Sequence, residues 1–218
     1  SALCADGANE IFGGNNIYRE PFDVAVFNGL PDSIKNSFAK YSKNFPDNSK
    51  GRKFIKRTER SLESRYIGNL YAFSDKERKK LLKNKTASPK SYEITAPLYK
   101  KVNSSDSVTK MQYIDINLRL AQDILNINDK MSMINSLELK FPFLRLNVFE
   151  TARHIPVEYR VNSQNTKYAL RLAAKRHIHS NLNDFKAGSN PPVRAWLKDE
   201  KYYNVIKTAF NSDNAAKF

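Results

Sequence analysis

Only one cysteine, Cys4, is present among the 218 residues of the chain. An internal disulfide is therefore excluded, and a lone thiol is typical of a reducing compartment. No apolar run approaches the length of a membrane-spanning helix, and no charged-then-apolar leader opens the sequence. These absences predict a cytoplasmic protein without a membrane partner.

The alternation of apolar and polar residues that marks a strand is almost absent, and only residues 24–27 hint at extended chain. Apolar residues recur instead at helical spacings of three and four. They predict helices over residues 34–45, 55–70, 74–82, 113–125, 148–155 and 202–210. Residues 86–109, rich in Ser, Lys, Asn and Pro, are expected to form a long mobile loop. The chain is thus predicted to be mainly α.

Basic residues outnumber acidic ones, and the net charge is +15. Lysine and arginine gather in residues 50–60 and 76–85, and such a basic field attracts phosphates. We interpret both runs as solvated helix faces, because the nearby Phe54, Tyr66 and Tyr71 have the spacing of core residues. No nucleic-acid-binding motif is present, so a nucleic acid partner is not expected.

Residues 4–15 read C-A-D-G-A-N-E-I-F-G-G-N and combine glycines with acidic and amide side chains. Glycine lets the backbone approach a ligand closely, and carboxylates beside it suit a magnesium ion or an electrophilic carbonyl. These residues could form a nucleotide loop, although such loops are also common where nothing binds. Their order resembles the S-G-E-G-A-D-E-L-F-G-G-Y signature of the asparagine synthase family.

Three further blocks carry the same resemblance. Residues 128–144, N-D-K-M-S-M-I-N-S-L-E-L-K-F-P-F-L, are similar to the family's V-D-R-M-S-M-A-x-S-L-E-x-R-x-P-F-L. Residues 167–171, K-Y-A-L-R, match K-x-x-L-R, and residues 186–197 follow K-x-G-F-x-x-P-x-x-x-W-L. The four blocks stand in the family's order and cover nearly the whole chain.

The resemblance implies a fold as well as an activity. The family's synthetase domain is an α/β adenine-nucleotide-hydrolase-like (ATP pyrophosphatase) fold, in which a parallel sheet with an S-G-G-x-D-S loop precedes a helical distal half. That loop does not occur here, nor does the glutaminase domain with its cysteine nucleophile. Residues 1–218 are therefore expected to form a single partial domain, the helical distal half, with the parallel-sheet half largely missing.

The implied activity is that of an ATP-dependent ligase in asparagine biosynthesis. ATP and Mg²⁺ would activate the carboxylate of aspartate as an acyl-adenylate, which ammonia released from glutamine by the glutaminase domain would then attack. Residues matching catalytic positions of the family are Asp6, Glu138 and Lys186. Residues matching nucleotide or anion contacts are Cys4, Ala5, Gly7, Lys167 and Arg171. Asn9 falls at the magnesium ligand.

Each match has an ordinary structural alternative. Glu138 could equally be a capped or salt-bridged buried acid. An isolated lysine such as Lys186 is usually a surface residue, and Met131 and Met133 are expected to pack in the core.

Departures from the family pattern leave the substrate and the activity open. Asn9 replaces an aspartate with a neutral oxygen donor, which weakens a magnesium site. Arg145 replaces the aspartate after P-F-L, and Asp6 is one carbon shorter than the family's glutamate. The alternatives are a related amidoligase acting on a sugar acid or a peptide, and a catalytically silent binding or assembly subunit. The fragment alone is not expected to be active, and an oligomer remains open.

Overall fold

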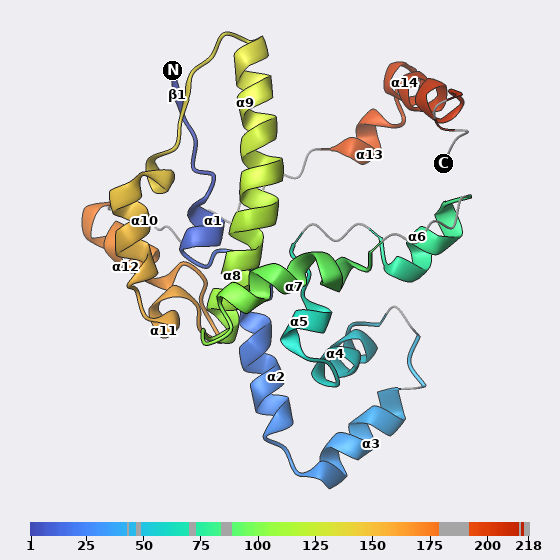
Figure 1. Ribbon diagram of the computed structural model, residues 1–218, viewed down its shortest axis with the longest axis vertical. Helices are drawn as coiled ribbons and strands as arrows, with labels where there is room; N and C mark the ends of the chain where they lie inside the picture. The colour runs from blue at the N-terminus through green and yellow to red at the C-terminus, as the bar shows by residue number, and fades with distance from the viewer. Residues whose placement is uncertain are drawn as a thin grey trace. The chain divides into compact units, whose positions relative to one another are not determined.

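The computed structural model describes residues 1–42, 44–46, 49–69, 73–83, 89–178, 192–213 and 215. These residues are mainly helical, as predicted (Figure 1). The α-helices are α1 (Ala8–Ile11), α2 (Glu20–Asn28), α3 (Asp32–Ser42), α4 (Lys50–Thr58), α5 (Leu62–Arg65), α6 (Asp75–Leu81), α7 (Ser91–Lys101), α8 (Ser107–Asp115), α9 (Leu125–Ile134), α10 (Leu146–Arg153), α11 (Val157–Arg160), α12 (Tyr168–His177), α13 (Val193–Trp196) and α14 (Glu200–Phe210). Short 3₁₀ turns span Asn16–Arg19 and Pro142–Leu144.

Strand structure in the described part of the chain is limited to one small parallel sheet. Strand β1 (Ala2–Leu3) pairs with β2 (Leu139–Lys140), so that Ala2 lies opposite Leu139 and Leu3 opposite Lys140. This agrees with the expectation that little of a parallel sheet is present. None of the described helices is long and apolar enough to span a membrane.

The chain divides into two units, residues 1–71 with 91–179 and residues 72–90 with 180–218. The first unit contains both hydrophobic clusters. One cluster is built around Tyr18, Leu62, Tyr66, Tyr99, Val108, Met111, Ile114 and Val161, and the other around Ile11, Phe12 and Ala152. The second cluster takes in Ile11 and Phe12 from residues 4–15, called here the acidic loop, and so anchors that loop to the core. The expectation of a single partial domain stays a prediction.

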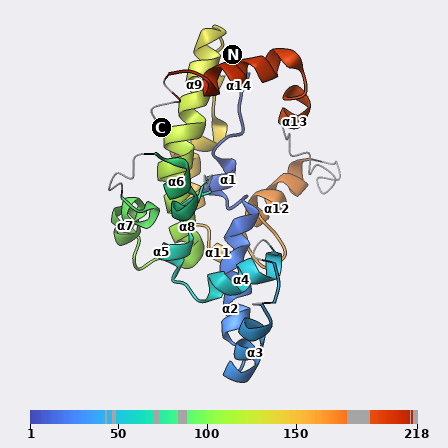
Figure 2. The ribbon, with the colours of Figure 1, turned by 90° about the vertical axis from the view of Figure 1, so that its right-hand side faces the viewer.

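The longest helical stretch runs without a break from Ser107 to Ile134, through α8, a π-helical section at Ile116–Ile124, and α9 (Figures 1 and 2). It begins where the Asp106 carboxylate accepts a hydrogen bond from the Thr109 N–H at 2.9 Å. The predicted helix at 113–125 is therefore confirmed but too short. Met131 and Met133 on α9 are exposed, so the expectation that they pack in the core is wrong.

Several other predicted elements are confirmed, namely the helices at α3, α6, α10 and α14 and the Ser74–Glu77 capping box. Three expectations are wrong. Residues 24–27 lie in α2, and the helix expected over 55–70 is interrupted at residues 59–61 between α4 and α5. The loop expected over 86–109 contains α7, in which Thr95 and Tyr99, four residues apart, are buried on one face. Residues 86–88 lie outside the described residues.

The buried carboxylate of Asp115 links separate segments of the first unit. Its Oδ2 accepts hydrogen bonds from the hydroxyls of Tyr18 and Tyr66, each at 2.6 Å. Its Oδ1 accepts one from the Asn69 N–H at 2.9 Å. Burial, together with the nearby Asp115 charge, raises the pKa of both tyrosines well above the ordinary value of 10. Both hydroxyls therefore stay protonated while the protein is folded.

The raised tyrosine pKa values predict a loss of stability at alkaline pH. Below pH 10 the folded and unfolded chains both hold these protons, but above it only the unfolded chain releases them, so unfolding becomes easier. The free energy of unfolding should fall by up to about 1.4 kcal/mol per pH unit for each tyrosine. Urea unfolding between pH 8 and 11 measures this slope.

Tyr18→Phe and Tyr66→Phe should each flatten that slope, while Tyr41→Phe, at an exposed position, should leave it unchanged. Equal slopes in all four proteins would contradict the role assigned to Asp115.

Candidate functional site

Strand pairing brings the first and second sequence motifs together. The Ala2 N–H donates to the Glu138 carbonyl and the Cys4 N–H to the Lys140 carbonyl, both at 2.8 Å. The acidic loop thus begins beside Lys140, just after the S-L-E segment, although Cys4 and Lys140 lie 136 positions apart in sequence. Because the Cys4 N–H is used in this sheet, a nucleotide beside it would have to contact the Cys4 carbonyl instead.

Gly7 makes the sharp turn between the strand and α1. Its φ of +89° is a left-handed conformation that side chains rarely adopt. A Cβ added there would also overlap the side chain of Leu144, which belongs to the P-F-L part of the second motif. The Gly7 carbonyl accepts from the Ile11 N–H at 2.9 Å and starts α1. Glycine is required here for both conformation and close packing.

The carboxylate of Asp6 is held by two donors. The Asn128 side-chain amide donates to Asp6 Oδ2 at 2.6 Å, and the Cys4 thiol donates to the same oxygen at 3.1 Å. Burial raises the pKa of the Cys4 thiol. The Asp6 backbone opposes this rise through a hydrogen bond to the sulfur, whereas the Asp6 carboxylate adds to it by accepting the thiol hydrogen bond and repelling the thiolate. Asp6 is therefore a positioned acid rather than a freely rotating surface residue.

Asn128 was not identified as a site residue from the sequence. The available signal was that it occupies a position where the matching family motif has valine, which is an unusual place for an amide.

Behind the loop, Glu10 is 1% exposed. Its Oε1 accepts from the Asn15 amide at 3.3 Å, and its main-chain carbonyl accepts from the Gln112 amide at 2.7 Å. The side-chain oxygen of Gln112, Oε1, accepts in turn a hydrogen bond from the Arg160 guanidinium at 2.6 Å. This chain of bonds fixes the end of the loop to α8 and α11. Neither Glu10 nor Gln112 was singled out as a site residue.

Lys167 lies against the same loop. Its N–H donates to the Gly13 carbonyl at 3.2 Å, and its φ of +51° turns the chain into α12. Burial lowers the pKa of Lys167, the neighbouring Arg171 lowers it further, and the charge of Glu10 opposes both. The structure thus places a partly buried cation beside the acidic loop, which suits contact with an anion.

The remaining predicted site residues are less enclosed. Ala5 and Asn9 are exposed, and the Glu138 side chain is 69% exposed with Lys140 at 3.6 Å as an ion-pair partner. No hydrogen bond or ion pair between the side chains of Asp6 and Glu138 is found in the described part of the chain. Lys186 lies outside the described residues.

The described residues do not fit a magnesium site on their own. They contain no group of three or more His, Cys, Asp or Glu side chains arranged to hold a metal ion. Asn9 offers one neutral oxygen, and the adjacent Glu10 is already bonded to Asn15. Magnesium in proteins is bound through carboxylates and substrate phosphates, so Asn9 alone is insufficient.

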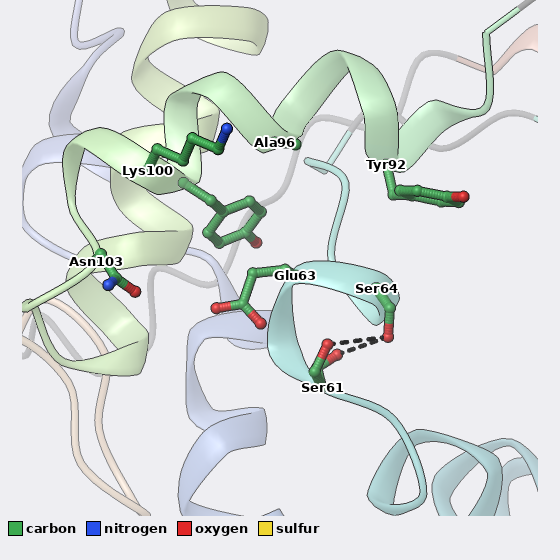
Figure 3. Close-up of a pocket in the computed structure, with 8 residues that line it drawn as sticks. Ser61, Glu63, Ser64, Tyr92, Ala96, Lys100 and Asn103 are labelled. Atoms are coloured by element: carbon green, nitrogen blue, oxygen red, sulfur yellow. Dashed lines mark hydrogen bonds between the residues drawn. The ribbon is translucent and has the colours of Figure 1, made fainter.

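A separate cavity of about 470 Å³ lies between α5 and α7 (Figure 3). It is lined by Ser61, Glu63, Ser64, Tyr92, Ala96, Tyr99, Lys100 and Asn103. Several of these groups already have partners, since Ser61 and Ser64 bond to each other at 3.3 Å and Glu63 pairs with Lys110 at 3.5 Å. None of the lining residues belongs to the four motifs, so the cavity is distinct from the motif site.

Comparison with known proteins decides the family. The sequence profile named asparagine synthase matches residues 1–218. The chain belongs to the asparagine synthase family. It is 38% identical over 200 residues to "Asparagine synthetase [glutamine-hydrolyzing] 1" of Bacillus subtilis, covering 91% of this chain and 32% of the relative. It is also 38% identical over 197 residues to "Putative asparagine synthetase [glutamine-hydrolyzing]" of Mycobacterium tuberculosis, covering 90% of this chain and 30% of that protein.

The chain therefore spans about a third of the length of these family members. No solved structure matches it significantly.

The geometry of Gly7 gives a direct prediction for this family member. Gly7→Ala should lower the free energy of unfolding by about 1–3 kcal/mol, because it strains the left-handed turn and displaces Leu144. Urea unfolding measures the change. Gly51→Ala is the matched control, since nothing lies within 4 Å of its added Cβ. It should be neutral or stabilise by up to about 1 kcal/mol. Equal effects of the two substitutions would contradict the packing described for the loop.

Proposed function

We propose that this chain is the distal helical part of the synthetase domain of an ATP-dependent amidoligase. The parent protein would activate a carboxylate as its adenylate and let ammonia from glutamine attack it, with aspartate as substrate and asparagine as product. The observation that carries this proposal is the carboxylate of Asp6, held by Asn128 and Cys4 where the β1–β2 pairing joins the first two motifs. Family membership supports it independently.

Each matched residue would have a distinct role in the reaction. Asp6 would receive a proton from the attacking amine, which requires a carboxylate in a fixed place. The backbone of Cys4, Ala5 and Gly7 would line the adenylate. Lys167 and Arg171 would attract phosphate oxygens, because a partly buried cation interacts strongly with an anion.

Glu138 and Lys186 would complete the catalytic set, with Glu138 near the substrate carboxyl and Lys186 at the departing phosphates. Bound ATP would supply the adenylyl group, and Mg²⁺ would neutralise phosphate charge. Since Asn9 does not suffice as a metal ligand, the carboxylates that hold Mg²⁺ would come from other parts of the parent protein.

Two alternatives each have an observation in their favour. Arg145, exposed at the start of α10 next to Leu144, adds a positive charge near the loop and favours a carboxylate other than aspartate, such as a sugar acid or a peptide. Asn9, a neutral and exposed residue at the position of a metal ligand, favours a silent binding or assembly subunit.

ATP–pyrophosphate exchange by the full-length parent protein tests the proposal. Exchange should require a carboxylate substrate, and aspartate is the first to be tried. Asp6→Asn should leave this exchange in place but lower the rate of ammonia-dependent amide synthesis by about 100-fold or more, because the acceptor for the amine proton is lost. Asp23→Asn, at an exposed acid on α2 outside the four motifs, is the matched control and should be without effect.

Each outcome separates the candidates. Exchange with another carboxylate alone would replace aspartate as the substrate. Silence in the parent with recovery in Asn9→Asp would identify a lost metal ligand and a silent relative. Amide synthesis by the isolated 218-residue chain would contradict the proposal that it is only part of the enzyme.

A further inference from the structure

We propose that Asn128 is a positioning residue for Asp6. The Asp6–Asn128 pair would replace the glutamate and valine that the family motifs have at these two positions. Asn128 would fix the Asp6 carboxylate so that one of its oxygens faces the reaction. The catalytic part of this inference rests on the proposed function, whereas the positioning part rests on the geometry.

The first argument is the arrangement of donors around the carboxylate. Both the Asn128 amide, at 2.6 Å, and the Cys4 thiol, at 3.1 Å, donate to Oδ2 of Asp6. No donor to Oδ1 is found in the described part of the chain. Two bonds on one oxygen fix the rotation of the carboxylate, and the second oxygen keeps its capacity to accept a proton.

The second argument is the contrast with other asparagines of the same helix. Asn117, Asn126 and Asn135 each donate to the carbonyl four residues earlier, at 2.8, 3.5 and 2.8 Å. These are local contacts within the helix. Asn128 instead donates to a residue 122 positions away in the chain. This long-range bond distinguishes Asn128 from the other asparagines.

The third argument is that two departures from the family motif meet at this bond. Asp6 is shorter than the glutamate of the motif, and Asn128 replaces the valine. Valine has no donor, whereas the asparagine amide reaches the shorter carboxylate. The Asp6 carboxylate already lies 2.6 Å from the Asn128 amide, so the longer glutamate would be crowded by that amide. Aspartate therefore fits opposite asparagine, and glutamate fits opposite valine.

Cys4 provides a reporter that does not depend on enzymatic activity. It is the only cysteine of the chain, and its thiol bonds to Asp6 Oδ2. The rate of iodoacetamide alkylation against pH reports the pKa of this thiol, because the thiolate is the reactive form. Asp6→Asn calibrates the assay and should increase alkylation near neutral pH, since the negative acceptor is gone.

The Asn128 amide also makes a weak 4.0 Å contact with the Cys4 sulfur, and loss of that contact alone would slow alkylation. Asn128→Val and Asn128→Ala should nevertheless each increase alkylation near neutral pH by about threefold or more, in the direction of Asp6→Asn, because the freed carboxylate leaves the thiol. Two substitutions guard against a folding defect in either, and circular dichroism checks the helix content. Asn126→Val on the same helix is the matched control and should match the unmodified chain. An unchanged pH profile in both Asn128 variants would overturn the positioning role.

A double-mutant cycle in the full-length parent tests whether the Asp6–Asn128 pair acts together. Asp6→Glu and Asn128→Val should each lower the kcat of amide synthesis by about tenfold or more, with little change in KM for ATP. The double variant should recover to within a few-fold of the parent. Additive losses would overturn the claim that the two residues together replace the motif's pair. A parent without exchange activity would refute the proposed function, and the thiol profile would then decide the positioning role alone.

Discussion

The buried carboxylate of Asp115 is the interaction on which the first unit depends. It accepts from Tyr18, from Tyr66 and from the backbone of Asn69, and so ties the long helix to two other segments. A buried charge is tolerated only when such donors surround it. The loss of one donor would leave the Asp115 charge incompletely hydrogen-bonded and would destabilise the fold. The Tyr18 hydroxyl also accepts from the Asn15 amide at 3.2 Å, which bonds Glu10 as well. The core contact therefore extends directly to the back of the acidic loop.

Elements with a strong local pattern could be predicted from the sequence. The apolar stripe of α14 and the capping box of α6 are examples, because each signal lies within a few neighbouring residues. Helix α7 was missed because only two of its residues, Thr95 and Tyr99, are buried, because it contains Pro97, and because the residues around it are rich in Ser, Lys and Asn. The break at 59–61 was missed because the apolar spacing continues across it from Ile55 to Leu62, although the chain turns at residues 59 and 60.

The site shows the same division between local and distant contacts. Asp6 and Gly7 could be found because their motif is contiguous, and the need for glycine at Gly7 is then explained by its φ and by Leu144. Asn128 and Gln112 could not, because their partners lie about 100 or more residues away and leave no periodic trace. Composition also gave no indication that Glu10 would be buried.

The unbroken helix from Ser107 to Ile134 carries both contacts that hold the loop, Gln112 near one end and Asn128 near the other. Between them lies the π-helical section, whose wider hydrogen-bonding pattern sets how far the helix has rotated by the time it reaches Asn128. One residue added or removed there would turn Asn128 by about 100° around the axis, away from Asp6. The number of residues in the π-helical section therefore sets the direction of Asn128 and is constrained as strictly as the identities of Gln112 and Asn128.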